Sequence, residues 1–221
     1  MAQSARLKDL KKRIRQIGRL LPLTSPTGAY TDVEYDQTRA FQLLSHAEIE
    51  AYLEDSAKDV ANFTVSGWIN DGEPRSCVAH LLLHETHEEL PNQWTSLSIQ
   101  DRVTKARDRY LTSLTRNNGI KERNVLRILL PLGVHEGDLS ATWLANMNSF
   151  GTARGMTAHS AKNVQTPPDP VAERQRVAQL IRDLGRVDSL LMSQSRRRQA
   201  SLVMRWMDQG SIDLGAARRR N

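Results

Sequence analysis

Apolar residues recur at helical spacing through most of the chain, and this spacing is the strongest constraint on its fold. Leu7, Leu10, Ile14 and Ile17 follow it near the start, with Lys and Arg between them. Such spacing places apolar side chains on one face of an α-helix. The sequence has no convincing alternating run typical of a strand, no hairpin dipeptide between such runs and no repeat of fixed period. We therefore predict an all-α fold of six to eight helices.

Residues that break helices divide the chain into segments. After a first helix that stops near Pro22, helices are expected from about Asp36 to Ile69, over residues 76–90, from Ser98 to the Asn117-Asn118-Gly119 break, over residues 120–130, after Ser140, and from Asp169 to Leu191. Ser98 and Asp101 form a typical capping box. Gly151 and Gly155 are expected to interrupt or loosen the helix that follows Ser140.

The charge of the chain is unevenly distributed along the sequence. Residues 1–30 carry seven Lys/Arg and one Asp, and residues 174–221 carry eleven Lys/Arg and four Asp. The section between them carries thirteen Lys/Arg against twenty Asp/Glu. Two basic ends that flank an acidic middle can attract a polyanion such as RNA, and they can equally be solvated helix faces and a basic tail.

Cysteine content and hydropathy limit the compartment and the class of protein. Cys77 is the only cysteine, so neither an intramolecular disulfide nor a cysteine-rich metal site can form. The first ten residues lack the apolar core of a signal peptide, and no stretch approaches the roughly 18 apolar residues that span a bilayer. The sequence predicts a cytoplasmic protein with no membrane partner.

Most easily recognised enzyme motifs are missing, which leaves the histidines as the candidates for chemistry. The chain contains no phosphate-binding glycine loop, no H-E-x-x-H and no G-x-S-x-G. His80, His84 and His87 share one helix face at positions i, i+4 and i+7. This stripe could bind Zn²⁺, but no second ligand-bearing segment accompanies it, so a polar helix surface is the favoured interpretation. We predict no metal and no cofactor.

Arg154 and His159 form the candidate catalytic pair. An imidazole can take or give a proton near neutral pH, and a guanidinium can neutralise charge that develops on phosphate oxygens. RNA supplies its own nucleophile, the 2′-hydroxyl. On an ideal helix, two residues that are five positions apart, as Arg154 and His159 are, point about 140° apart and lie about 7.5 Å apart along the axis. The pair can therefore converge only if the helix begins or bends near Gly155, or if two subunits share a cleft.

Three segments together resemble the HEPN superfamily, most closely its RiboL-PSP-HEPN branch. These are RAFQLLSHAEIEAYLED (residues 39–55), NNGIKERNVLRILLPLG (117–133) and WLANMNSFGTARGMTAH (143–159), and the resemblance spans about Tyr35 to Leu191. The motif arginine of the family matches Arg154, and its motif histidine matches His159. The family commonly has a polar residue after this arginine, where this chain has Gly155. The branch often has histidine where this chain has Asn118.

The resemblance implies a fold and an activity. It implies an up-and-down helical bundle, commonly dimeric, in which the two R-x-x-x-x-H segments meet across the interface. It also implies metal-independent RNA cleavage that leaves a 2′,3′-cyclic phosphate and a 5′-hydroxyl, often in a toxin–antitoxin or phage-defence system with an antitoxin partner. On this basis residues 1–30 are a basic N-terminal helix and linker, residues 31–195 the HEPN-like domain, and residues 196–221 a basic C-terminal tail.

Further residues are candidates for RNA binding. Asn148, Lys162, Asn163 and Glu50 are assigned to this role, although Glu50 can equally belong to a solvated acidic face. His46 is interpreted as a polar packing residue. Trp143 could stack on a base, but its helical spacing with Met147 and Phe150 favours a place in the core.

Two other functions fit the same sequence. The first is a non-catalytic HEPN-like module that binds RNA or a partner protein through its basic ends. The second is a structural or regulatory helical bundle that associates only with proteins. The first predicts salt-sensitive RNA binding without turnover, and the second predicts no RNA affinity beyond that due to charge.

Overall fold

The computed structural model describes residues 3–72, 75–85, 97–159 and 167–196, without the side chains of residues 85, 156–159, 195 and 196. Within these ranges the chain forms seven α-helices and no strand, which confirms the all-α prediction. The helices are α1 (Ala5–Ile17), α2 (Asp32–Asp71), α3 (Ser76–Glu85), α4 (Ile99–Thr115), α5 (Glu122–Leu129), α6 (Ala141–His159) and α7 (Pro170–Arg196). The 3-10 turns are η1 (Gly18–Leu20), η3 (Leu130–Leu132) and η4 (Glu136–Asp138).

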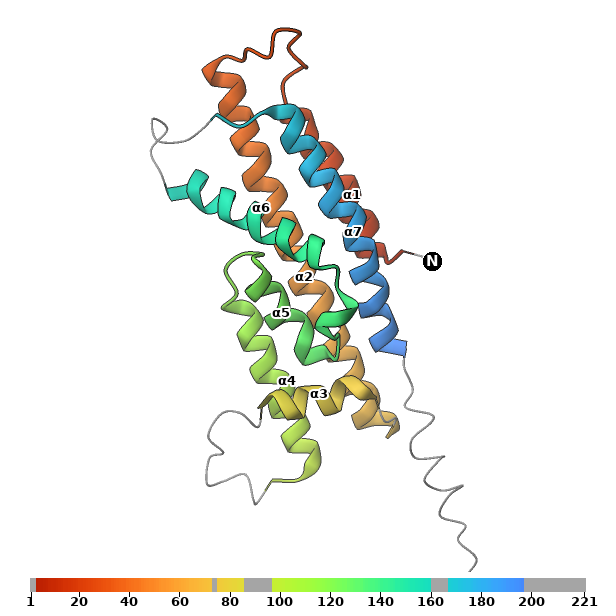
Figure 1. Ribbon diagram of the computed structural model, residues 1–221. Helices are drawn as coiled ribbons and strands as arrows, with labels where there is room; N and C mark the ends of the chain where they lie inside the picture. Colours follow the sequence, from red (N-terminus) through yellow and green to blue (C-terminus); the bar gives the residue numbers. More distant parts are fainter. Residues whose placement is uncertain (1–2, 73–74, 86–96, 160–166, 197–221) are drawn as a thin grey trace, which may run out of the picture.

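Helix α2 is the central element of the bundle. It has 40 residues and is therefore about 60 Å long. Helices α1 and α7 lie side by side along one part of it, whereas α3, α4 and α5 gather around its C-terminal part (Figure 1). Helix α6 crosses α2 between these two groups and also contacts α5 and α7. Every other helix thus has α2 as a neighbour.

Helix α2 begins four residues earlier than the sequence pattern predicts, at Asp32 instead of Asp36. The cause is a capping box that the sequence analysis did not include. The Thr31 hydroxyl accepts from the Glu34 backbone N–H at 3.3 Å, and the Thr31 backbone N–H donates to the Glu34 carboxylate at 2.7 Å. The predicted capping box of Ser98 with Asp101 at the start of α4 is confirmed.

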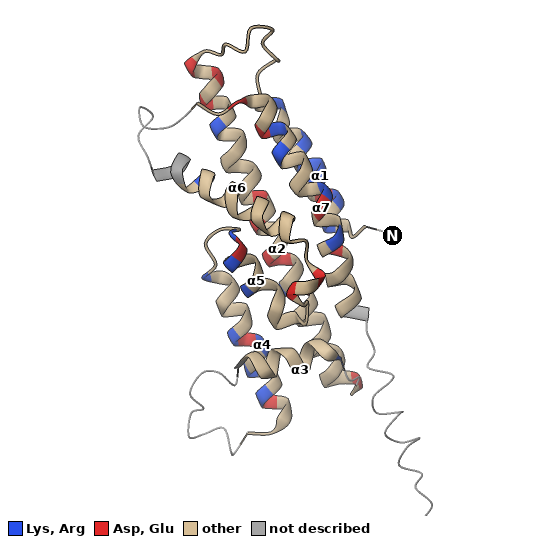
Figure 2. Ribbon diagram, viewed as in Figure 1, with Lys and Arg blue, Asp and Glu red and all other residues tan. Residues whose placement is uncertain are grey.

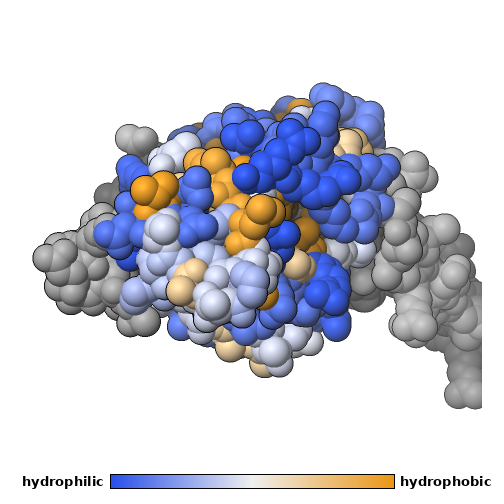
Figure 3. Space-filling view, turned by 90° about the horizontal axis from the view of Figure 1, so that it is seen from above, coloured by the Kyte–Doolittle hydropathy of each residue, from blue (hydrophilic) through white to orange (hydrophobic). Residues whose placement is uncertain are grey.

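The apolar positions predicted from helical spacing form one continuous core. Trp143, Met147 and Phe150 of α6 are each at most 1% exposed, which confirms their assignment to the core. Apolar residues of α1 belong to the same core, so α1 packs as part of the bundle. At the end of the molecule where α1 leads to α2, apolar surface remains open among hydrophilic residues (Figure 3). Leu23 in this connection and Val33 in the first turn of α2 are 92% and 66% exposed.

Of the prediction that Gly151 and Gly155 interrupt or loosen the helix after Ser140, the interruption is wrong, because α6 continues through both glycines to His159. Glycine has a low helix propensity, but at Gly151 the helix is stabilised by close packing against another part of the chain. A β-carbon there would lie 3.0 Å from Lys121 Cγ and 3.3 Å from the Lys121 backbone nitrogen. Glycine therefore lets α6 approach the backbone that leads into α5.

The two glycines of α6 are expected to respond in opposite directions to substitution. No described atom lies within 4 Å of a β-carbon built at Gly155, so Gly155→Ala should raise the free energy of unfolding by about 0.5–1 kcal/mol through helix propensity. Gly151→Val should lower it by about 1–3 kcal/mol, because the added methyl groups push α6 away from Lys121. Urea unfolding followed by circular dichroism measures both changes, and a stabilising Gly151→Val would contradict the packing argument.

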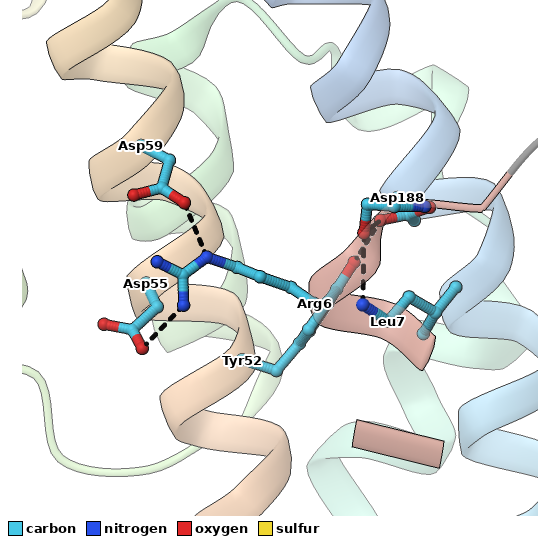
Figure 4. A network of polar contacts seen from close by, with 7 residues as sticks. Arg6, Leu7, Tyr52, Asp55, Asp59 and Asp188 are labelled. Atoms are coloured by element: carbon cyan, nitrogen blue, oxygen red, sulfur yellow. Dashed lines mark hydrogen bonds and ion pairs between the residues drawn. The ribbon is translucent and has the colours of Figure 1, made fainter. Parts of the chain in front are cut away.

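A buried polar network ties the start of α1 to α2 and α7 (Figure 4). The Asp188 carboxylate of α7, only 3% exposed, accepts from the Ser4 backbone N–H at 2.9 Å, from the Tyr52 hydroxyl at 2.9 Å and from the Ser4 hydroxyl. On the neighbouring face, Arg6 pairs with Asp55 at 3.0 Å and with Asp59 at 2.5 Å. These contacts fix the position of α1 on the bundle.

In the described part of the chain, no helix is both long enough and apolar enough to cross a lipid bilayer.

Candidate active site

The three segments on which the family resemblance rests come together in the fold. Residues 39–55 belong to α2, residues 117–133 form the α4–α5 loop, α5 and η3, and residues 143–159 belong to α6. Helix α2 contacts both α5 and α6, and α5 contacts α6 (Figure 1). Residues 39–55 thus lie beside two segments that follow more than 60 residues later in the sequence.

Two glutamates of α2 hold the loop between α4 and α5. Asn117 Nδ2 donates to Glu54 Oε1 at 2.7 Å and to Glu50 Oε1 at 3.3 Å. The backbone N–H of Gly119 also donates to Glu50 Oε1. Asn124 of α5 closes the network by donating from Nδ2 to Asn117 Oδ1 at 2.9 Å. The loop conformation is therefore set by side chains from α2 and α5.

Gly119 is required at its position in this loop. Its φ of +111° lies in the region that favours glycine over residues with a β-carbon. A β-carbon there would also lie 3.8 Å from His46 Nε2, so the loop backbone runs directly over the imidazole of His46. The sequence prediction of a break at Asn117-Asn118-Gly119 is confirmed, because α4 ends at Thr115 and α5 begins at Glu122.

His46 lies beneath the loop and is neutral at neutral pH. It is 1% exposed, and its ring centroid is 6.1 Å from that of Phe150. Its Nδ1 is 3.6 Å from Glu50 Oε2, which is beyond hydrogen-bonding distance. Burial lowers the pKa of His46 to about 4, and the positive charge of Arg154 adds to this shift. Its burial agrees with the interpretation of His46 as a polar packing residue.

The pKa of His46 predicts how stability depends on pH. An unfolded histidine titrates near pH 6.5, so between pH 6.5 and 4 the unfolded state binds a proton that the folded state does not. The free energy of unfolding should therefore fall as the pH drops through this window, by roughly 2 kcal/mol from His46 alone. Urea unfolding at pH 7.5 and 4.5 measures this loss. Between the two pH values, the free energy of unfolding of His46→Gln should fall by roughly 2 kcal/mol less than that of the wild type. Equal decreases would mean that His46 titrates normally.

Arg154 is the cation of this cluster. It is half-buried on α6, close enough for its charge to lower the pKa of His46. Within the described part of the chain it forms no ion pair with an acidic side chain, whereas Arg6, Arg13 and Arg39 each pair with a carboxylate. Arg154 therefore remains available to an anionic ligand.

The other predicted site residues fall into three groups. Asn148 is exposed on α6 and lies one turn before Gly151, as Arg154 lies one turn after it, so the two flank the contact of α6 with Lys121. Glu50 contacts the loop through Oε1, which favours a positioning role over direct RNA contact. His159 is the last residue of α6 and its side chain is outside the described set, as are Lys162 and Asn163 entirely.

The sequence analysis missed three residues of the network: Glu54, Asn117 and Asn124. Glu50 and Glu54 are spaced i, i+4 and share a helix face, and the two asparagines flank the glycine break. This combination was a usable signal for acidic side chains that anchor a loop. Which loop they anchor depends on the tertiary arrangement.

The two described histidines of the α3 stripe, His80 and His84, lie in different surroundings. The His80 ring packs edge-on against His135 at a centroid distance of 5.7 Å, and burial together with His135 lowers the pKa of His80. His84 faces a separate cavity beside α4, and His87 lies outside the described residues. Over residues with described side chains, no three His, Cys, Asp or Glu residues are grouped as metal ligands would be.

Comparison with protein-family models, with curated proteins and with solved structures finds no match to this chain.

Proposed function

We propose that this chain is a metal-independent endoribonuclease of the HEPN type that acts in the cytoplasm. The observation that carries the proposal is Arg154, a half-buried cation without a described ion-pair partner, beside a loop that Glu50 fixes in place. The proposal is supported by the contacts among α2, α5 and α6, the helices to which the three family-like segments largely belong, because Arg154 lies on α6. A bundle of the HEPN type is the fold that goes with this proposal.

The proposed reaction uses the substrate's own nucleophile. The 2′-hydroxyl of RNA attacks the adjacent phosphorus while His159 accepts its proton, and Arg154 stabilises the charge that develops on the phosphate oxygens. The bond from phosphorus to the 5′-oxygen breaks, and this oxygen leaves with the bonding electrons and takes up a proton from water. The products are a 2′,3′-cyclic phosphate and a 5′-hydroxyl.

A homodimer is part of the proposal, because one helix does not bring the pair together easily. Helix α6 begins at Ala141, so it does not begin near Gly155. Along a regular helix, Arg154 and His159 point about 140° apart. A cleft shared by two copies of α6 provides the other route to convergence. Leu44 lies two residues before His46 on α2, and its side chain is 40% exposed. A second copy of the chain can cover this apolar side chain.

Analysis of the reaction ends tests the activity. Purified protein is incubated with a 5′-labelled RNA in EDTA, and the fragments are treated with a phosphatase that cannot remove cyclic phosphates, before and after acid opening of the ring. We expect cleavage with cyclic ends in the presence of the chelator. Products with a 5′-phosphate, or no cleavage of RNAs of varied sequence, would contradict the proposal.

A non-catalytic RNA-binding role is the second candidate, and the position of the basic residues favours it. Lys and Arg run along the adjacent helices α1 and α7 (Figure 2), so the basic N-terminal segment and part of the second basic section lie side by side. This role predicts salt-sensitive RNA binding without turnover. The proposals of an antitoxin partner and of a role in a toxin–antitoxin or phage-defence system apply only if the protein is a nuclease.

A further inference from the structure

A basic cavity borders the start of the loop between α4 and α5. It has a volume of about 560 Å³ and lies between α3, α4 and the end of α5. We call it the arginine groove. Its polar lining consists of Arg109, Arg116, Arg127, His84, Thr112 and Ser113, and none of its described lining residues is acidic.

The arginines of this groove converge from two helices. Arg109 and Arg116 are seven residues apart on α4, so they lie on one face with about 10.5 Å between them along the axis. Arg127 faces them from the last turn of α5. Among described residues, no carboxylate forms an ion pair with Arg116 or Arg127, whereas the nearby Arg107 pairs with Asp108 at 2.7 Å.

Two effects bear on Arg116 and Arg127, the arginines of the groove without a described ion pair. A cation near the C-terminus of a helix is favourable, and this applies to both. Their like charges also converge on one cavity and repel one another, and a bound anion removes this cost. Arginine suits phosphate in particular, since its planar fork of N–H donors matches two phosphate oxygens.

The groove and the candidate active site share the same loop. Arg116 immediately precedes Asn117, which Glu50 and Glu54 hold. Arg127 follows Asn124 by three residues, about 4.5 Å along α5. The loop between α4 and α5 thus joins the two places along the chain, and the proposed path of the RNA rests on this connection.

We propose that the arginine groove binds phosphate groups of single-stranded RNA next to the cleaved linkage. This proposal rests on the proposed ribonuclease function and names the path of its substrate. A cavity of about 560 Å³ is in the range of small-ligand pockets, so it fits one or two phosphates of a single strand.

Binding of an uncleavable RNA tests the groove without relying on catalysis. The probe is a fluorescein-labelled, single-stranded 12-mer in which every ribose is 2′-O-methylated, which removes the nucleophile. Fluorescence anisotropy at several salt concentrations compares the wild type with Arg116→Gln/Arg127→Gln. We expect Kd to rise about tenfold or more and the salt slope to decrease by about 1.4, since each phosphate contact to a single strand contributes about 0.7.

Two further variants separate contact from general charge. Lys12→Gln/Arg174→Gln removes the same charge from exposed positions on the basic face of α1 and α7, which the second candidate function would use. If the groove and not this face holds the RNA, this pair should change Kd by less than about twofold. Arg116→Lys/Arg127→Lys keeps the charge without the forked donors, so it should retain most of the salt slope while binding more weakly. Circular dichroism melts confirm that all variants fold.

The outcomes distinguish this proposal from the nuclease proposal. If the groove variant binds the probe as tightly as the wild type, or if the control pair loses more affinity, the groove proposal is wrong even when the wild type cleaves RNA. If the wild type never cleaves RNA but the groove variant alone loses affinity, the groove stands as an RNA-binding site and the nuclease proposal falls.

Discussion

Replacing Arg154 with Ala is expected to lower the rate of RNA cleavage by roughly a thousandfold, and His159→Ala should have an effect of the same order. The arginine stabilises charge that exists only in the transition state, so its loss acts mainly on kcat. Arg154→Lys keeps the charge but not the fork and should recover part of the rate. The cleavage rate of a labelled RNA under single-turnover conditions measures all three variants.

The matched control for Arg154→Ala is Arg174→Ala, which removes an exposed arginine from α7 without a described ion pair. It should cleave at the wild-type rate. Circular dichroism and size-exclusion chromatography should show unchanged helicity and oligomeric state for every variant. If Arg154→Ala or His159→Ala cleaves as fast as the wild type, the assignment of this pair is wrong.

Mixing the two inactive variants tests whether two subunits share the site. If Arg154 of one copy works with His159 of the other, half of the dimers in an equal mixture contain one intact site. Activity should then return to about a quarter of the wild-type level after exchange of subunits. If the pair acts within one chain, the mixture stays inactive while the individual activities of wild type and control are unaffected.

Asp188→Ala is expected to lower the free energy of unfolding by roughly 3 kcal/mol. The substitution removes the acceptor of three donors, two on the half-buried Ser4 and one on the buried Tyr52. The Tyr52 hydroxyl cannot adapt by ionising, because burial and the charge of Asp188 raise the pKa of Tyr52 well above its usual value. Urea unfolding followed by circular dichroism measures the loss.

Tyr52→Phe is the matched control for the Asp188 network. It removes one donor and leaves the carboxylate bonded to Ser4, so it should cost only about 1 kcal/mol. Asp188→Asn should lie between the two, since it retains one oxygen acceptor. A smaller loss for Asp188→Ala than for Tyr52→Phe would show that the network contributes little to the attachment of α1.

Local signals in the sequence predicted most helix boundaries. Ser98 with Asp101 marks the start of α4, and Asp169 caps α7 by accepting from the Val171 backbone N–H at 3.0 Å. Such caps act within a few residues, so they can be read from the sequence. The continuity of α6 through Gly151 could not, because it depends on the approach of Lys121 from a distant part of the chain.

The candidate site was predictable only in part, for the same reason. The position of Arg154 on a helix follows from sequence spacing, and its assignment follows from the family resemblance. The anchoring of Asn117 by Glu54 joins residues 63 positions apart, and the burial of His46 depends on where the loop crosses α2. Such properties arise from the packing of helices, which spacing along the chain does not specify.

The length of α2 has a consequence for the way the protein can be handled. Glu50 and Tyr52 are two positions apart on this helix and point to nearly opposite sides, one to the loop and one to Asp188. The Asp188 carboxylate that binds Tyr52 also accepts from the Ser4 backbone N–H, so a change in the chain near Ser4 lies one hydrogen bond away from α2. Variants should therefore be compared with identical N-termini, so that a difference in activity reflects the substituted residue.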